Sequence, residues 1–232
     1  MNEPRCLTRD QARALDRLAI DVIGIPGVVL MENAAINATA VLLDALDARL
    51  DLAPADVSAC VACGPGNNGG DGFAIARHLH GWGAAVRLYA VRPLEELAGD
   101  AAINALACRN LGLPIAFDPD PAAWDRAHLL VDSLLGTGFA SDTVRSPMDA
   151  WIEAVNAAEH ADVVAAIDCP SGIDVDTGRP AATTVHADLT ITFAAAKPGL
   201  IADAAAKHVG DLVVADIGLP DELLDRVRQT DP

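Results

Sequence analysis

The segment VSACVACGPGNNGGDG, residues 57–72, decides the fold of this chain. An apolar run from Val57 to Cys63 has the length and composition of a buried strand. The glycine-rich turn Gly64–Gly72 follows it, and apolar residues then recur at helical spacing over 73–82. A strand, a glycine-rich turn and a helix in this order are typical of the first unit of a dinucleotide-binding fold. We therefore expect the turn to be the ligand-binding centre.

The same alternation of strand and helix continues along most of the chain. Apolar runs predict further strands at residues 85–91, 115–117, 129–135, 163–168, 189–194 and 212–216. Periodic patterns predict helices at residues 8–22, 29–46, 73–82, 94–111 and 147–159. Thr8 with Gln11 predicts a capping box at the first helix, and Ser146 is the expected N-cap of the last.

Continuous apolar strands that alternate with amphipathic helices indicate a parallel sheet with helices on both faces. We expect an α/β fold: a doubly wound, mostly parallel sheet in a three-layer α/β/α sandwich of the Rossmann-like type. The sequence shows no internal repeat and no second-domain boundary, so residues 1–232 are expected to form a single domain. The two N-terminal helices are expected to pack on one side of it or to reach a partner subunit.

The overall charge excludes two classes of partner. The formal net charge is -17, and a field of this sign repels nucleic acid and anionic membrane surfaces. Residues 1–11 contain no apolar segment of the kind found in a signal peptide, and no uninterrupted apolar run is long enough to cross a bilayer. A phosphate-bearing small molecule stays compatible, because amides at a helix N-terminus bind anions locally.

Cysteine usage indicates a reducing compartment. The chain has 5 cysteines, at positions 6, 60, 63, 108 and 169, and their neighbours are mostly apolar. An odd number of such residues is typical of reduced thiols in a cytoplasmic protein. Cys60 and Cys63 form a CxxC pattern, but residues three apart on a strand point to opposite faces. We therefore expect neither zinc nor redox chemistry from them.

Three polar, glycine-rich segments each follow a predicted strand. They are GPGNNGGDG after the first strand, DSLLGTG at 132–138 and DCPSGIDVDTG at 168–178. In open parallel sheets, ligands bind beyond the carboxyl ends of the strands. We therefore expect the three segments to line one crevice.

The glycine-rich turn differs from an ordinary dinucleotide fingerprint. Gly64, Gly66 and Gly69 satisfy GxGxxG, but the acidic residue that binds a ribose is missing at the end of the next strand, which closes on Val91 and Arg92. The amides and carboxylate of the NNGGD segment, residues 67–71, are groups that a plain phosphate loop does not need. The alternative is that these Asn and Asp side chains only shape the turn.

The chemistry of the strand ends favours a hard cation. Asn68, Asp132 and Ser171 offer oxygen ligands without imidazole or thiolate, which suits an alkali or alkaline-earth ion better than zinc. Asp132 and Asp168 each close a strand, so a simple capping role is the alternative for both. Lys197 stands in a Lys-Pro-Gly turn, where an exposed lysine is equally compatible. The six histidines are scattered and form no triad by spacing.

Taken together, five motifs resemble one family. GPGNNGGDGFAIARHL, MENAA (31–35), VDSLLGTG, AIDCPSGIDVDTG and ADLTITFAAAKPGL occur in this order, and the chain is similar to the NAD(P)H-hydrate epimerase family, the YjeF N-terminal domain, from about Thr8 to Gly218. The resemblance implies a Rossmann-like sandwich that interconverts the R and S forms of hydrated NADH and NADPH. A partner dehydratase specific for the S form can then repair both forms.

The resemblance also implies site residues. The implied contacts to the hydrated nucleotide are Asn67, Asn68, Gly69, Gly70, Asp71, Gly136, Thr137, Gly138, Phe139, Ala140, Ser141, Asp142 and Asp168. The implied ligands of a potassium ion are Asn68, Asp132 and Ser171. The sequence departs from the family pattern in the segment after Gly138, FASDTVRS, which is weakly patterned. The dehydratase domain fused to some relatives is not expected in this chain, and the family implies a homodimer.

The reaction suggests a role for one carboxylate. The substrate carries a hydroxyl on C6 of the reduced nicotinamide ring, and the adjacent ring nitrogen can stabilise an iminium-like intermediate. Asp168 is our first choice as general acid and base, with Asp71 and Lys197 in reserve. An NAD(P)-dependent oxidoreductase is the alternative enzyme, against which the missing ribose acid counts. A catalytically silent nucleotide-binding protein on the same fold is the other alternative, against which the full set of polar site residues counts.

Overall fold

The computed structural model describes residues 6–229. The two ends of the predicted domain 1–232 lie outside the described residues, as do residues 1–5 of the segment that is expected to lack a signal peptide. The described chain builds one parallel sheet in the order β3-β2-β1-β4-β5-β6-β7. The strands are β1 (Ser58–Cys63), β2 (Ala85–Ala90), β3 (Ile115–Ala116), β4 (Leu129–Ser133), β5 (Val163–Ile167), β6 (Leu189–Phe193) and β7 (Asp211–Ala215). The predicted α/β fold with a parallel, doubly wound sheet is confirmed.

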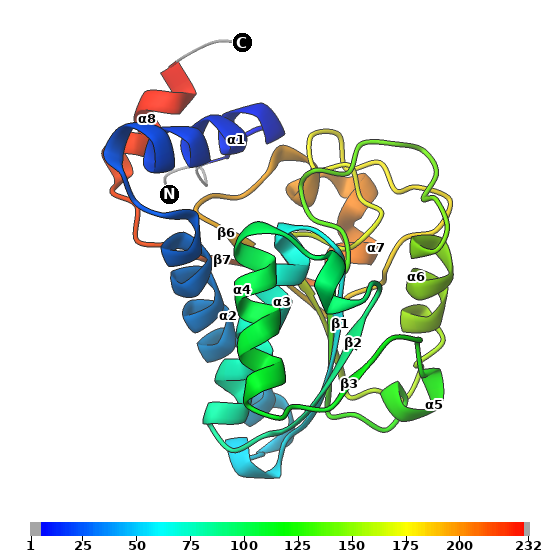
Figure 1. The fold of residues 1–232 in the computed structure, drawn as a ribbon. Helices are drawn as coiled ribbons and strands as arrows, with labels where there is room; N and C mark the ends of the chain where they lie inside the picture. Colours follow the sequence, from blue (N-terminus) through cyan, green and yellow to red (C-terminus); the bar gives the residue numbers. More distant parts are fainter. Residues whose placement is uncertain (1–5, 230–232) are drawn as a thin grey trace.

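Helices cover both faces of the sheet, as Figure 1 shows. The longer ones are α1 (Arg9–Arg17), α2 (Gly27–Leu50), α3 (Asn67–Gly81), α4 (Gly99–Asn110), α6 (Met148–Asn156) and α8 (Asp221–Gln229), and α5 (Pro121–Trp124) and α7 (Ala206–Val209) are single turns. Helices α2, α3 and α4 lie on one side of the strands, whereas α5 and α6 lie on the other. Helix α1 packs against α8 at the end of the molecule where the strands finish.

Alternating side chains of each strand fill the two cores. On β1, Val61 and Cys63 belong to the apolar cluster beneath α2 and α3, whereas Cys60 and Ala62 belong to the cluster beneath α6. The prediction that the CxxC thiols point to opposite faces is therefore confirmed. Burial raises the pKa of the Cys63 thiol far above its ordinary value, which makes the thiol unreactive.

Several predicted boundaries were wrong, and each has a local reason. The capping box of Thr8 and Gln11 is present, but the first helix gives way after Arg17 to a π-helical segment that Gly24 ends with φ of 86°. The predicted helix 94–111 begins only at Gly99, because a short 3-10 turn at Leu94–Glu96 precedes it. The last predicted helix begins at Met148 with Pro147 as N-cap, so Ser146 is not the cap, and the proline ring offers no acceptor in its place.

Helix α2 is long and apolar enough to count as a candidate membrane span, although no such run was expected from the sequence. By length and mean hydropathy (1.4) it passes as a candidate span, although polar residues interrupt its apolar run. One face of the helix carries Leu42 and Leu46, which are 0% exposed because they pack in the core beside β1. Burial of this face against the sheet is the behaviour of a core helix in a globular domain.

Candidate active site

The candidate site lies at the carboxyl ends of the central strands. The strand order reverses between β1 and β4, whose neighbours are β2 on one side and β5 on the other. A crevice forms at such a reversal, because the connections leave toward opposite faces of the sheet. The three polar segments that follow β1, β4 and β5 all reach this edge, as the sequence predicts.

The glycine-rich segment is more helical than predicted. Helix α3 begins at Asn67 with Gly66 as N-cap, so the segment NNGGD forms its first turns rather than a loop. Helix formation here depends on close backbone approach: a Cβ on Gly69 would lie 1.8 Å from the Gly64 carbonyl oxygen, and one on Gly72 would lie 1.9 Å from Ser133 Oγ. The N-cap Gly66 makes no side-chain capping bond, and the first N–H groups of a helix have no partner within it, so this turn suits an anion such as a phosphate.

Asn68 is buried without a partner. Its residue is 8% exposed, and neither its Oδ1 nor its Nδ2 has a hydrogen bond to any part of the chain that the structure describes. It lies against the loop after β4, since a Cβ on Gly136 would be 3.1 Å from Asn68 Cβ. A buried amide that makes no hydrogen bond costs free energy, so a ligand at this point would relieve that cost. Its neighbour Asn67 is exposed.

Asp132 and Ser171 form a buried pair, as the sequence predicts. Both residues are 0% exposed. Ser171 donates to Asp132 through its Oγ (2.7 Å) and its backbone N–H (2.8 Å), and the N–H of Leu134 is a third donor (3.1 Å). Burial raises the pKa of Asp132 to about 6, although these three hydrogen bonds oppose the rise. The capping alternative therefore describes only part of the environment of this carboxylate.

Asp168 is held at the end of β5 in an unusual backbone conformation. Its φ is 66°, a left-handed conformation that non-glycine residues seldom adopt and that clusters at functional sites. Its Oδ2 accepts from the backbone N–H of Thr137 at 2.7 Å, and its Oδ1 lies 3.3 Å from Lys197 Nζ. Lys197 is 3% exposed, so the alternative of an exposed turn lysine is wrong.

Lys197 is fixed by three acceptors. Its ammonium donates to Thr192 Oγ1 at 2.7 Å and to the Phe193 carbonyl oxygen at 3.0 Å, besides Asp168. These contacts join the ends of β5 and β6 into one polar group. The charged pair is nearly enclosed, with side-chain exposures of 4% for Lys197 and 14% for Asp168.

Two further carboxyl groups interact electrostatically with this site. Burial raises the pKa of Asp71 well above its ordinary value, and the neighbouring carboxylates of Asp168 and Asp16 raise it further. Burial, followed by the Asp168 carboxylate, also raises the pKa of Asp16, which stands on α1. Burial and the mutual repulsion of these carboxylates therefore favour the protonated forms of Asp71 and Asp16.

Arg9 of α1 holds the loop after β4, and sequence analysis missed it. Its Nε donates to the Thr137 carbonyl oxygen at 2.7 Å, and its Nη2 donates to the Phe139 carbonyl oxygen at 3.0 Å. The same guanidinium pairs with Asp174 at 2.8 Å and with Asp176 at 3.2 Å. Arg9 thus connects α1 to two of the three polar segments.

The rest of the predicted nucleotide contacts lie farther out. The carbonyl of Asp142 accepts from Ala182 N at 3.1 Å, and its carboxylate lies 4.0 Å from Arg179 in an exposed pair. Ser141 is exposed and accepts from the backbone of Thr143. The structure places Gly136 and Thr137 beside Asp168, whereas contacts between the nucleotide and residues 139–142 stay a prediction.

The donor set fits a hard monovalent cation better than a transition metal. Among residues 6–229 no group of three His, Cys, Asp or Glu side chains is arranged for a metal, so thiolate or imidazole sites are not formed there. The buried Asp132 carboxylate has no Lys or Arg partner in the described chain, and the Asn68 amide oxygen lacks a donor. Both features fit a cation with oxygen ligands.

Comparison with known proteins agrees with the motifs. Residues 27–199 match the family model described as YjeF-related protein N-terminus. The chain is similar to the NAD(P)H-hydrate epimerase of Rhodopirellula baltica, with 39% identity over 221 residues that cover 94% of this chain and 86% of the relative. It is also similar to the NAD(P)H-hydrate epimerase of Limosilactobacillus fermentum, with 40% identity over 212 residues that cover 91% of this chain and 96% of the relative.

Two further comparisons concern domain context and fold. The bifunctional NAD(P)H-hydrate repair enzyme Nnr of Coxiella burnetii is 40% identical over 217 residues, which cover 94% of this chain and 42% of that longer protein. The crystal structure of yeast ynu0 has a TM-score of 0.80 at 19% identity and covers 98% of this chain and 94% of its own, which shows the same fold. By its family model and its relatives, the chain belongs to the YjeF-related protein N-terminus family, in which the NAD(P)H-hydrate epimerases are found.

Proposed function

We propose that this chain is an isomerase that interconverts the R and S forms of hydrated NADH and NADPH in nicotinamide nucleotide repair. One observation carries the proposal: the family's motifs converge on the Asp168 carboxylate, which Lys197 and the Thr137 amide hold at the carboxyl edge of the sheet. The relatives named NAD(P)H-hydrate epimerase cover nearly the whole chain. An oxidoreductase is disfavoured, because Arg92, at the position of the ribose acid, pairs with Glu96 instead.

The site supplies what inversion at C6 requires. The first-turn amides of α3 and the glycine loop 136–138 bind the pyrophosphate and leave the nicotinamide at Asp168. This carboxyl protonates the departing hydroxyl, and the ring nitrogen donates its electron pair to form the iminium. Water then adds to the other face of C6, and the carboxylate accepts a proton from it. Acid–base help of this kind contributes roughly 10²–10⁴-fold to the rate.

We further propose that a potassium ion binds Asn68, Asp132 and Ser171. The unpartnered Asn68 amide and the buried Asp132 carboxylate support this site. A potassium ion held by these residues would supply positive charge against the nucleotide phosphates. The chain's own part is to present these three oxygen ligands on α3, β4 and the segment after β5.

The partner and the assembly belong to the same proposal. In the Nnr relatives the matching segment is part of a longer bifunctional repair enzyme, which supports a dehydratase specific for the S form as functional partner. A homodimer is supported by apolar side chains that α2 and α4 expose, namely Val29, Ile36, Ile103 and Leu106. The buried thiols Cys60, Cys63, Cys108 and Cys169, none of them in a disulfide, support a cytoplasmic location.

A coupled assay tests the function. Purified R-NADHX is incubated with an S-specific dehydratase, with and without this protein, and the return of NADH is followed. We expect complete conversion at a rate proportional to the added protein, against slow conversion in its absence. If the protein leaves the rate unchanged, the proposed function is wrong. Absorbance at 340 nm with NAD and common alcohols tests the oxidoreductase alternative, for which we expect no change.

A further inference from the structure

Helix α1 forms a wall of the site, although it precedes the part of the chain that the family model matches, residues 27–199. Arg9 joins the start of the helix to the Thr137 and Phe139 carbonyl groups and to Asp174. The guanidinium side chain is 12% exposed, so these contacts are enclosed and restrain the helix. The position of α1 over the loop 137–139 is therefore fixed by direct bonds.

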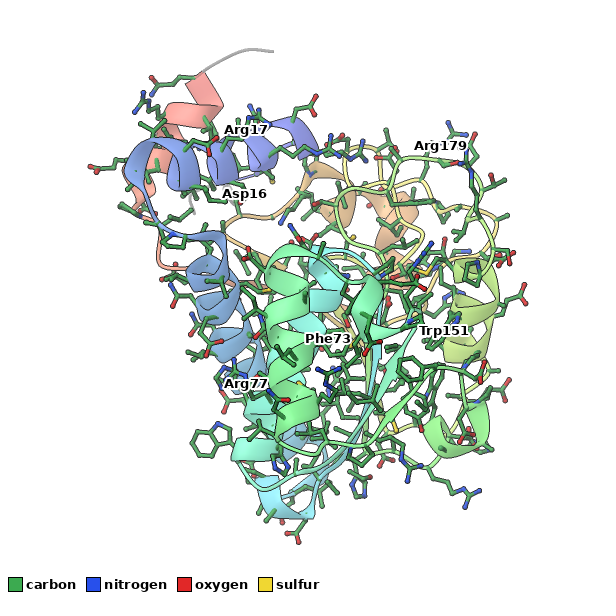
Figure 2. All side chains as sticks on the ribbon, viewed as in Figure 1. Asp16, Arg17, Phe73, Arg77, Trp151 and Arg179 are labelled. Atoms are coloured by element: carbon green, nitrogen blue, oxygen red, sulfur yellow. The ribbon has the colours of Figure 1, made fainter. Side chains whose placement is uncertain are left out.

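Asp16 shares the Arg9 face of this helix. The two residues are about two helical turns apart, which places their side chains nearly in line along one side. Figure 2 shows Asp16 on the side of α1 that faces the body of the molecule. Because Arg9 reaches the loop after β4, the same face directs Asp16 toward the strand ends.

The electrostatic neighbours of Asp16 are the site residues. Its carboxyl group interacts with Asp168, Lys197 and Arg17, and it is among the charges that act on Asp71. The residue is exposed to solvent, although the surrounding protein is still the largest cause of the raised pKa of its carboxyl group. A group on the wall of an open crevice has both properties. None of the sequence motifs includes Asp16.

We propose that Asp16 is a second catalytic carboxyl of the epimerase, which faces Asp168 across the nicotinamide, and that Arg9 positions it by fixing α1. This inference rests on the proposed epimerase function and divides between two carboxyl groups the acid and base steps that were assigned above to Asp168 alone. One carboxyl on a strand end and one on a covering helix approach the ring from different elements. Inversion requires that water leaves one face of C6 and adds to the other, and two carboxyl groups serve the two faces without rotation of the substrate.

The proton balance closes with these two groups. Protonated Asp16 gives its proton to the C6 hydroxyl, the C6–O bond breaks, water leaves, and the ring nitrogen forms the C=N bond. A second water forms the new C6–O bond while Asp168 takes its proton and the nitrogen regains its electron pair. Asp16 ends as a carboxylate and Asp168 as an acid, and proton exchange with solvent restores them. Conversion of the other epimer uses the two groups in the opposite roles.

Three variants test the proposal. Asp16→Asn removes the acid, Asp16→Glu keeps a carboxyl, and Asp10→Asn is the control, because Asp10 lies on the same helix with 78% of its side chain exposed. We expect Asp16→Asn to lower kcat about 100-fold or more with little change in KM, and to remove one limb of the pH profile. Asp16→Glu should recover part of kcat, and Asp10→Asn should match the wild type.

Stability and isotope exchange separate a catalytic role from a structural one. Asp16→Asn should keep or raise Tm, because it removes a carboxyl group whose charge is disfavoured. Epimerisation in H₂¹⁸O should place ¹⁸O on C6, at a rate that falls with kcat in Asp16→Asn. An active wild type with unchanged Asp16→Asn kinetics, a fall in Tm that matches the loss of activity, or retention of the original oxygen would overturn this inference alone. An inactive wild type would overturn the proposed function as well.

Discussion

The contact between Asn68, Gly136 and Asp168 offers a direct structural test of the site. In Gly136→Ala the new Cβ would lie 2.8 Å from Asp168 Oδ2, 3.1 Å from Asn68 Cβ and 3.3 Å from Asn68 Cγ. These atoms are not free to move away, since Asp168 is bound to Lys197 and Thr137 and Asn68 is part of α3. The methyl group therefore acts as a wedge inside the site.

The size of the effect follows from the distances. To restore an ordinary contact of 3.4 Å or more, the Asp168 oxygen must move by roughly half an ångström. Overpacking of this kind costs about 1–3 kcal/mol of the free energy of unfolding, which lowers Tm by roughly 2–12 °C in a domain of this size. Displacement of a catalytic group by about 1 Å can lower kcat by roughly 100-fold, so a shift of about half that size should lower kcat by roughly 10-fold or more.

Gly138→Ala is the matched control for stability. A Cβ at Gly138, in the same loop, meets nothing within 4 Å, so Tm should change by less than about 2 °C. Thermal unfolding and the coupled epimerase assay are measured on the wild type and both variants. A Gly136→Ala protein with wild-type Tm and wild-type kcat would refute the packing of Asn68, Gly136 and Asp168 described above.

Three further predictions address the cation, α1 and pH. If a potassium ion binds the folded chain, potassium chloride should raise Tm of the wild type relative to tetramethylammonium chloride at equal ionic strength. Asn68→Ala should lose this difference in Tm, and an equal response of both proteins would contradict the cation site. Burial alone would raise the pKa of Asp174, but the Asp176 amide and Arg9 bring it below the ordinary value of 3.8, so the ionised carboxylate adds stability above pH 3.8 that is lost as pH falls through the folded pKa. Arg9→Met should therefore raise the pKa of Asp174, measured by carboxyl NMR, and should make the free energy of unfolding less sensitive to acid. Burial lowers the pKa of His208 below 6.5, so protonation of the unfolded chain costs stability as pH falls below 6.5. Denaturant unfolding should therefore show a smaller fall in the free energy of unfolding from pH 7 to 5 in His208→Gln than in the wild type, and equal falls would contradict this role.

The sheet was predictable because its strands are nearly continuous apolar runs. Residues 57–63 and 163–168 carry few polar groups, and the observed strands end within one residue of these limits. The start of α3 was not predictable, because Asn, Gly and Asp favour turns when they are judged by local propensity. What stabilises the helix at Asn67 is close contact with the Gly64 and Ser133 positions of neighbouring segments, which no local pattern reports.

In the site, too, features set by local sequence patterns were predictable, whereas those set by contacts between distant segments were not. Asp132 and Ser171 were expected together because both follow central strands, and they bond directly. The exposed-lysine alternative for Lys197 failed because burial depends on the adjacency of β5 and β6, which a turn sequence does not encode. Arg9 and its partner Asp174 are separated by most of the chain, so no local pattern predicts their contact. The one local indication of a role for this helix is that Arg9 and Asp16 share one of its faces.

The most direct test of the account is the epimer ratio of the substrate itself. Pure R-NADPHX is incubated with the wild type or with Asp168→Asn, and the R and S forms are separated by chromatography over time. If Asp168 is the acid–base group, the wild type brings the two forms rapidly to their equilibrium ratio, and Asp168→Asn slows this approach by roughly 10²–10⁴-fold while it stays folded. Equal rates for the wild type and Asp168→Asn, or a wild-type rate no faster than the spontaneous one, would contradict it.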